Sequence, residues 1–219
     1  MLVHAEQLQA QLETGISDLG LELTEGTVER LLQYLEQLHK WNKAINLSGI
    51  RDPALMLTHH LLDSLAMLEH IDGAVVADVG TGAGLPGLPL AICLPSTRFL
   101  LIDSSSKKTR FLFQAATLLG LKNVEVVHSR VEDYAPNPAA DIVTSRAYAS
   151  LADFVQSCRH LLRYGAGSRL LAMKGRMPDA EIAAIPDDFH LHASHALKVP
   201  GLEAERCVLD LRPRSIPAR

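Results

Sequence analysis

The sequence predicts an α/β protein in which a doubly wound, mainly parallel sheet follows a helical N-terminal extension. From residue 71 onward, short apolar runs of strand character alternate with segments of helical character, and such alternation is typical of a parallel sheet that helices cover on both faces. A glycine-rich stretch, residues 78–87, follows the first apolar run, and the second run ends at Asp103. Glycines and an acid at these positions are typical of a nucleotide-binding edge of such a sheet.

The expected extension covers residues 1–70 and is helical. Apolar residues recur at helical spacing in residues 28–38, and Thr24 is the expected cap of that helix. Asp52 and Pro53 predict the start of a further helix, because a capping side chain there precedes a proline at the first helical position. We expect this helix to continue to about the end of the extension.

Residues 71–212 are expected to form the sheet domain, and residues 213–219 a frayed tail. Seven strands are expected, at 75–78, 99–103, 124–127, 141–144, 169–174, 190–196 and 206–211. Helices are expected near 86–94, 107–119 and 151–162. Gly120 is the expected C-terminal cap of the second helix, and Ser150 opens a capping box for the third. The last two strands are the expected place for an antiparallel edge.

Composition places the chain among ordinary globular proteins. Of its 219 residues, 47% are hydrophobic and 21% are charged, no apolar run approaches the length of a membrane span, and the first eleven residues lack the pattern of a secretory signal. Three scattered cysteines without a C-x-x-C pair indicate reduced thiols in a cytoplasm and no zinc site. A net charge of −4 argues against a globally basic nucleic-acid binder and allows a local basic face.

The glycine-rich stretch predicts a nucleoside-cofactor site, and two cofactor classes fit it. Gly82, Gly84 and Gly87 satisfy the dinucleotide pattern G-x-G-x-x-G, which indicates a nicotinamide or flavin enzyme. Asp78 inside the strand end, together with the spacing G-x-G-x-G, favours S-adenosylmethionine, whose ammonium group needs a carboxylate or carbonyls nearby. With either cofactor, the Asp103 carboxylate is expected to accept hydrogen bonds from two ribose hydroxyls. A methyltransferase is therefore the favoured interpretation, ahead of a dinucleotide enzyme or a turn without a ligand.

Six short blocks in order along the chain carry a more specific signal. They are KWNKAINL at 40–47, HLLDS at 60–64, DVGTGAGLPG at 78–87, SRVE at 129–132, SRA at 145–147 and KG at 174–175. With these blocks, the sequence from about residue 31 to residue 210 resembles the bacterial 16S ribosomal RNA guanine-N7 methyltransferases, also called glucose-inhibited division protein B. That family often has proline where this chain has Ala83. The resemblance implies a class I methyltransferase fold and S-adenosylmethionine as cofactor.

The resemblance also implies site residues and a substrate. Cofactor contacts are implied at Gly80, Leu85, Val131, Glu132 and Arg146. To these the residue patterns add Gly82 and Asp103. The implied substrate is N7 of one guanine in 16S ribosomal RNA within the small ribosomal subunit, with no obligate protein partner and no membrane.

Methyl transfer to guanine N7 needs no general base, because N7 carries a lone pair and no proton. We therefore expect catalysis by positioning alone, with no catalytic acid or base. Residues 144–147 read TSRA, whereas enzymes that methylate exocyclic amines often carry an Asn/Asp-Pro-Pro-aromatic block there. His60 and Asp63 have the spacing of one helix face, but two ligands do not make a metal site, and no metal is expected.

Basic residues near the carboxyl ends of the expected strands are candidates for RNA contact. Lys107 and Arg110 follow the second strand, and Lys174 and Arg176 follow the fifth. Phosphate binding by such a set makes affinity fall with added salt. A small-molecule methyltransferase, an inactive RNA-binding module and a nicotinamide-dependent oxidoreductase remain as alternatives.

Overall fold

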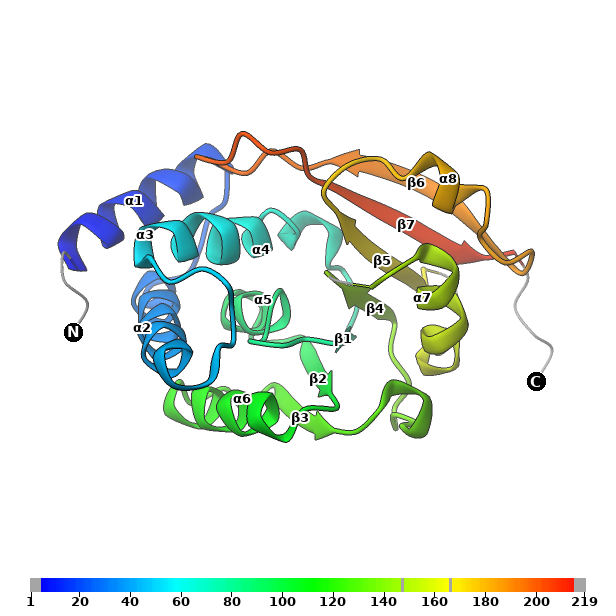
Figure 1. Cartoon of the computed structure of the whole chain (residues 1–219), viewed down its shortest axis with the longest axis horizontal. Helices are drawn as coiled ribbons and strands as arrows, with labels where there is room; N and C mark the ends of the chain where they lie inside the picture. The colour runs from blue at the N-terminus through cyan, green and yellow to red at the C-terminus, as the bar shows by residue number, and fades with distance from the viewer. Residues whose placement is uncertain (1–4, 147, 166, 215–219) are drawn as a thin grey trace.

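The computed structural model describes residues 5–146, 148–165 and 167–214. Its centre is a seven-stranded sheet with the order β3-β2-β1-β4-β5-β7-β6 (Figure 1). The strands are β1 (Val75–Val79), β2 (Arg98–Asp103), β3 (Val124–His128), β4 (Ile142–Ser145), β5 (Arg169–Lys174), β6 (Phe189–Ala196) and β7 (Cys207–Pro213). Strands β1 to β5 are parallel to one another, and β7 is antiparallel to both β5 and β6. The seven expected strands and the antiparallel edge are thus confirmed.

Short helices connect the strands close to the expected positions. They are α5 (Gly87–Cys93), α6 (Ser106–Leu118), α7 (Leu151–Cys158) and α8 (Asp179–Ile182), with 3-10 turns η3 (Val131–Asp133) and η4 (Arg159–Leu161). Gly120 follows α6 with a left-handed φ of 63°, and the Ser150 hydroxyl accepts a hydrogen bond from the Asp153 amide at 3.1 Å. Both expected caps are therefore confirmed. The third expected helix is shorter, since it ends at Cys158 and continues as η4.

The extension begins with α1 (Ala5–Asp18) and α2 (Thr27–Ile45). The expected cap at Thr24 is wrong. Gly26 precedes α2 in a left-handed conformation, φ 76°, and the Thr24 carbonyl accepts from the Thr27 amide at 3.1 Å. A tight turn therefore introduces this helix, because glycine adopts the left-handed conformation without steric cost.

The second part of the extension is not the single helix that the sequence predicts. It consists of α3 (Pro53–Met56), a π-helical segment η1 (Leu57–Leu62), α4 (Asp63–Leu65) and a 3-10 turn η2 (Leu68–His70). Its start is as expected, because Asp52 Oδ1 accepts from the Ala54 amide at 2.8 Å. The spacing of apolar residues does not distinguish an i→i+5 turn from an i→i+4 turn, and for this reason the π-helix was missed.

Each face of the sheet has its own apolar cluster. Val76 on β1 belongs to the cluster that contains Leu35 of α2 and Phe111 of α6. Its neighbour Ala77 belongs to the opposite cluster, which contains Phe154 of α7, as expected when successive strand side chains point to opposite faces. The extension therefore packs into the same core as α5 and α6. No described helix is long and apolar enough to cross a membrane.

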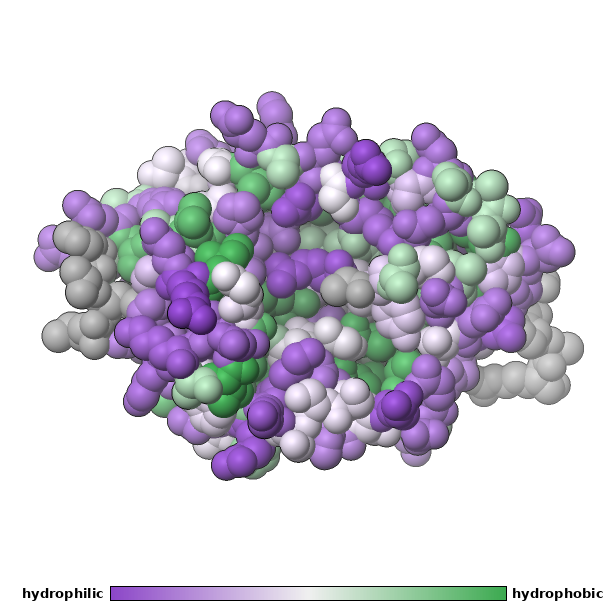
Figure 2. Space-filling view, in the orientation of Figure 1, coloured by the Kyte–Doolittle hydropathy of each residue, from purple (hydrophilic) through white to green (hydrophobic). Residues whose placement is uncertain are grey.

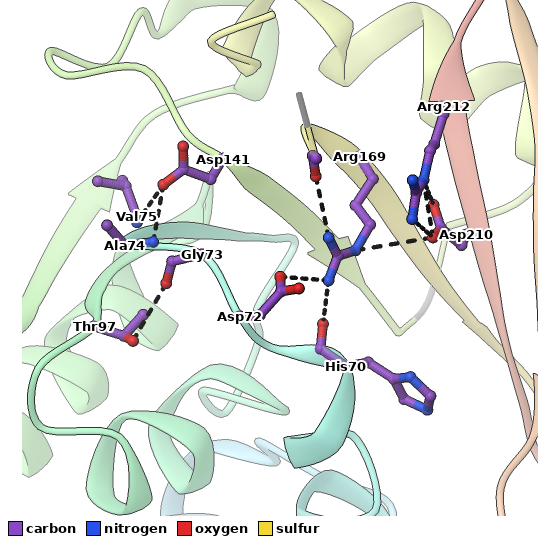
Figure 3. Close-up of polar contacts among 11 residues, drawn as sticks. His70, Asp72, Gly73, Ala74, Val75, Thr97, Asp141, Arg169, Asp210 and Arg212 are labelled. Atoms are coloured by element: carbon purple, nitrogen blue, oxygen red, sulfur yellow. Dashed lines mark hydrogen bonds and ion pairs between the residues drawn. The ribbon is translucent and has the colours of Figure 1, made fainter. Parts of the chain in front are cut away.

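An ionic cluster lies at the amino edge of the sheet, where the parallel strands begin (Figure 3). Arg169, at the start of β5, donates from Nη2 to Asp72 Oδ1 at 2.6 Å and to the His70 carbonyl at 2.9 Å. Its Nη1 donates to the Gly167 carbonyl at 3.1 Å, and its Nε lies 4.0 Å from Asp210 Oδ2. Because His70 ends the extension, this arginine links the extension to β5 and β7.

Candidate functional site

The carboxyl ends of β1 to β4 lie side by side at the opposite edge of the sheet, which we call the carboxyl edge (Figure 1). Val79 pairs with Ile102, and Asp103 pairs with His128. The Ser145 hydroxyl at the end of β4 donates to the Val79 carbonyl at 2.9 Å. The segments that carry the predicted cofactor residues therefore start from neighbouring strand ends.

The glycine-rich stretch has two parts with different reasons for glycine. Gly80 and Gly82 have left-handed φ values of 65° and 61°. No described atom lies within 4 Å of a Cβ built on Gly80, and the nearest to one on Gly82 is the Gly80 carbonyl oxygen at 3.8 Å. A Cβ on Gly84 or Gly87 would instead come within 2.7 Å of a neighbouring side chain. The first part thus borders open space, and the second part allows close packing.

Asp78 lies fully buried beneath this stretch. Its Oδ2 accepts from the Thr81 hydroxyl at 2.6 Å and from the Gly87 amide at 2.8 Å. Burial raises the pKa of the carboxyl group to about 6. Its Oδ1, also buried, has no hydrogen-bond partner among the described residues. A carboxylate with a spare acceptor under an open glycine cradle fits the amino acid head group of S-adenosylmethionine.

Asp103 supports the same stretch from the end of β2. Its Oδ2 accepts from the Gly82 amide at 2.9 Å and lies 3.4 Å from Lys108 Nζ, while its Oδ1 accepts from the Ser105 amide at 2.9 Å. The side chain is buried. The carboxylate therefore orders the cradle, and its predicted grip on the ribose hydroxyls stays a prediction.

A residue of the extension also holds the cradle. Tyr34 of α2 is fully buried, and its hydroxyl donates to the Ala83 carbonyl at 2.8 Å. The ring packs near Phe111 of α6 with the centroids 6.4 Å apart. Sequence reasoning missed Tyr34, because its helical spacing marks a core position and carries no sign of the polar bond.

The other predicted cofactor residues lie around the same edge. Leu85 is buried in the glycine-rich stretch. Val131 and Glu132 form the turn η3 after β3, where Val131 is buried and Glu132 is exposed. Their contact with a cofactor stays a prediction.

Arg146 follows β4 and turns toward the extension. Its Nη1 donates to the His59 carbonyl at 3.2 Å and lies 3.4 Å from Asp63 Oδ2. Arg206, just before β7, donates from Nε to Asp63 Oδ1 at 2.8 Å. Asp63 is buried, so one carboxylate holds two partly exposed arginines, and net positive charge remains. Arg206 was missed because it lies far along the chain, between two strands, in no recognisable motif.

His60 lies beside this cluster and stays neutral. Its Nε2 is 2.7 Å from the Ser48 hydroxyl. Burial, and then the charge of Arg146, lower the pKa of the imidazole to about 4. Among the described residues, no group of three or more His, Cys, Asp or Glu side chains is placed to hold a metal ion.

A cavity of about 360 Å³ opens beside Arg146. We call it the target cavity. It lies between the extension and the ends of β4 and β5, and it is lined by Ile50, His59, His60, Asp63, Arg146, Met173, Lys174, Gly175 and Arg206. Hydrophilic residues border the hollow near the centre of this face in Figure 2. Because Arg146 follows β4, and β4 pairs with β1, which leads into the cradle, the cavity opens at the same edge of the sheet as the predicted cofactor site.

The predicted RNA-contacting residues differ in how free their charges are. Lys107, Arg110 and Arg176 are exposed. Lys174 is largely buried and pairs with Glu181 at 2.8 Å, so its charge is already compensated inside the protein. RNA contact by the set stays a prediction.

Comparison with known proteins decides the family. The family described as rRNA small subunit methyltransferase G matches residues 27–209. The chain belongs to this family. It is 49% identical over 201 residues, 92% of this chain and 89% of the relative, to the ribosomal RNA small subunit methyltransferase G of Saccharophagus degradans. It is 50% identical to that of Ectopseudomonas mendocina, over 95% of this chain and 96% of the relative.

The fold also matches solved methyltransferase structures. A SAM-dependent methyltransferase from Aquifex aeolicus superposes with a TM-score of 0.55 and 20% identity, over 76% of this chain and 96% of that chain. The class I methyltransferase fold is thus confirmed. The protein is a methyltransferase with S-adenosylmethionine as its cofactor, as the glycine spacing predicts, and the dinucleotide alternative is set aside.

Proposed function

We propose that the protein transfers a methyl group from S-adenosylmethionine to N7 of one guanine in 16S ribosomal RNA of the small ribosomal subunit, in the cytoplasm. The observation that carries this proposal is the target cavity, which opens at Arg146, directly after the strand β4 that pairs with β1, and whose walls bear the positive charge of Arg146 and Arg206. A nucleotide is a planar base on a phosphate backbone, and such a cavity suits it.

In this proposal, S-adenosylmethionine supplies an electrophilic methyl group. The cradle and Asp78 hold the cofactor, and Asp103 fixes the cradle in place. The walls of the target cavity would hold the guanine with N7 toward the cradle, and the cofactor would supply the methyl group to that lone pair and leave as S-adenosylhomocysteine. Alignment of two bound reactants is the main source of acceleration.

The neutral state of His60 agrees with catalysis without an acid or base. Because the pKa of His60 is about 4, its protonation does not change between about pH 6.5 and 9. We therefore expect the rate at saturating substrate to show no steep titration in that range.

The test uses 16S RNA, free and assembled in small subunits, from cells that lack the protein. Methylation at N7 labilises the glycosidic bond, so borohydride and aniline should cleave the strand at one guanine after reaction with the purified protein and S-adenosylmethionine. Methyl incorporation into RNA without cleavage would place the methyl group on a ribose or an exocyclic amine. Absence of incorporation into either form of RNA would favour a small-molecule substrate.

A further inference from the structure

A further cavity, of about 400 Å³, adjoins the target cavity on the side of β6 and β7. The loop after β5, the end of β6 and the start of β7 form its walls. Arg206 lines both cavities, so the two cavities meet at this residue. We call this space the flanking cavity.

The lining of the flanking cavity combines apolar and cationic side chains. Met177, Ala196, Leu197 and Cys207 supply apolar surface, and Arg176 and Arg206 supply two positive charges against the one negative charge of Glu205. Met177 is 42% exposed, so its side chain is accessible to a ligand in this cavity. Apolar surface beside cations suits a nucleobase attached to its phosphate, because the base is planar and apolar on its faces and the phosphate is anionic.

Arg206 lies where the flanking cavity meets the target cavity, in which the proposed methyl transfer takes place. Its Nε is committed to Asp63 at 2.8 Å and its Nη1 to the Glu205 carbonyl at 2.8 Å, which fixes the guanidinium between the two cavities. A strand whose target base occupies one cavity must continue past that base. A phosphate beside Arg206 would then separate two consecutive bases.

We infer that the flanking cavity binds the nucleobase adjacent to the target guanine, with the phosphate between the two nucleotides at Arg206. This inference rests on the proposed function. A single-stranded RNA segment is the occupant that the charges favour. An apolar protein side chain would gain nothing from Arg176 and Arg206.

The test measures coupling between the cavity and one nucleotide. Met177→Ala removes exposed apolar surface from a loop, so the fold should be retained. Small-subunit RNA is prepared by splinted ligation with the intact sequence or with an abasic site on the 5′ or the 3′ side of the target guanine, in the form that the wild type methylates. We expect Met177→Ala to raise KM for the intact RNA about fivefold, the low end for loss of a base-stacking contact, with kcat and the Kd for S-adenosylmethionine unchanged.

The two abasic RNAs show whether Met177 contacts a base next to the target guanine. At one of the two positions, the abasic site should raise KM for the wild type but add nothing in Met177→Ala, because base and side chain belong to one contact. Leu118→Ala is the matched control, since Leu118 is 51% exposed on α6, near the other end of the sheet, and it should leave KM unchanged.

Three results would overturn the inference. The first is an unchanged KM in Met177→Ala, and the second is additive effects on KM at both abasic positions. The third applies if the wild type methylates both free RNA and subunits: an effect of Met177→Ala on subunits alone would indicate that a protein occupies the cavity. Failure of the proposed function is distinct, because the wild type itself would then form no 7-methylguanine.

Discussion

Two clusters of arginine and aspartate, at opposite edges of one sheet, differ in the balance of their charges. At the amino edge, two arginines meet two carboxylates: Arg169 bonds Asp72 and lies beside Asp210, and Arg212 donates to Asp210 at 2.7 Å (Figure 3). At the carboxyl edge, a single carboxylate, Asp63, holds both Arg146 and Arg206. A cluster whose charges balance is committed to the fold, whereas two arginines that have only one carboxylate between them keep charge for a ligand. We therefore expect the amino edge to determine stability and the carboxyl edge to determine binding.

The largest effect on cofactor binding is expected from filling the open space at the carboxyl edge. Gly80→Val should weaken binding of S-adenosylmethionine at least about 100-fold, or ~2.7 kcal/mol, because the added side chain enters the space of the cofactor. Gly120→Val is the matched control: Gly120 has a φ of 63° against 65° for Gly80, and no described atom lies within 4 Å of its Cβ position either. Calorimetric titration of both variants measures the difference. Equal affinities would mean that the space beside Gly80 is not the cofactor site.

At the amino edge, a substitution should lower stability and leave cofactor affinity unchanged. Arg169→Met removes a buried guanidinium and its hydrogen bonds to Asp72 and to two carbonyls, and should lower the free energy of unfolding by about 2 kcal/mol, with the Kd for S-adenosylmethionine unchanged. Arg146→Met, at the carboxyl edge, should weaken cofactor binding and cost less stability, since Arg146 is partly exposed. Urea unfolding and calorimetry on the two variants test this. The comparison fails if Arg169→Met weakens cofactor binding as much as Arg146→Met does.

Within the carboxyl edge, burial shifts two pKa values in opposite directions. The pKa of His60 falls from 6.5 to about 4, so its contribution to stability is present above pH 6.5 and is lost as the pH falls through 4. The pKa of Asp78 rises from 3.8 to about 6, so its contribution is present below pH 3.8 and is lost as the pH rises through 6. Each pKa shift changes the free energy of unfolding by about 3 kcal/mol between the ordinary and the shifted pKa. Between pH 4 and 6 the two changes have opposite signs and nearly cancel.

A variant that lacks one of these two ionisable groups should therefore show the pH dependence of stability that the other group causes. Relative to wild type, the free energy of unfolding of His60→Gln should fall by about 3 kcal/mol as the pH rises from 4 to 6.5, and that of Asp78→Asn should rise by a similar amount. Urea unfolding at a series of pH values gives both differences. Curves that run parallel to wild type would show that these groups titrate normally in the folded protein.

The smallest effect is expected from the bond between the extension and the cradle. Tyr34→Phe leaves the Ala83 carbonyl without its donor and should weaken cofactor binding by about 1 kcal/mol, roughly fivefold, with kcat unchanged at saturating cofactor. Tyr164→Phe removes a hydroxyl near the amino edge and serves as the control. If the two variants bind S-adenosylmethionine equally well, the extension contributes only to the core.

Local patterns in the sequence were sufficient to predict the sheet and the glycine-rich stretch. Apolar runs mark strands because a parallel sheet is buried on both faces, and Gly80 and Gly82 can be recognised because their backbone conformation restricts the residue type. Arg206 and Tyr34 could not be found in this way, because each acts through one bond to a residue distant in sequence, 143 positions for Asp63 and 49 for Ala83. Asp63 was noticed as a neighbour of His60 but assigned no role, since its partners Arg146 and Arg206 lie 83 and 143 positions away in sequence.

The π-helical segment η1 contains one residue more than the regular helical turn that could replace it. Each residue turns an α-helix by about 100°, and a π-turn accommodates one residue more than an α-turn. A one-residue deletion within Leu57–Leu62 would therefore restore regular helical bonding and leave Asp63 facing nearly the same direction. The same deletion in α2 would rotate the rest of that helix by about 100°. A deletion in η1 should thus cost its local contacts, such as that of His60 with Ser48, and preserve the direction of the chain that follows.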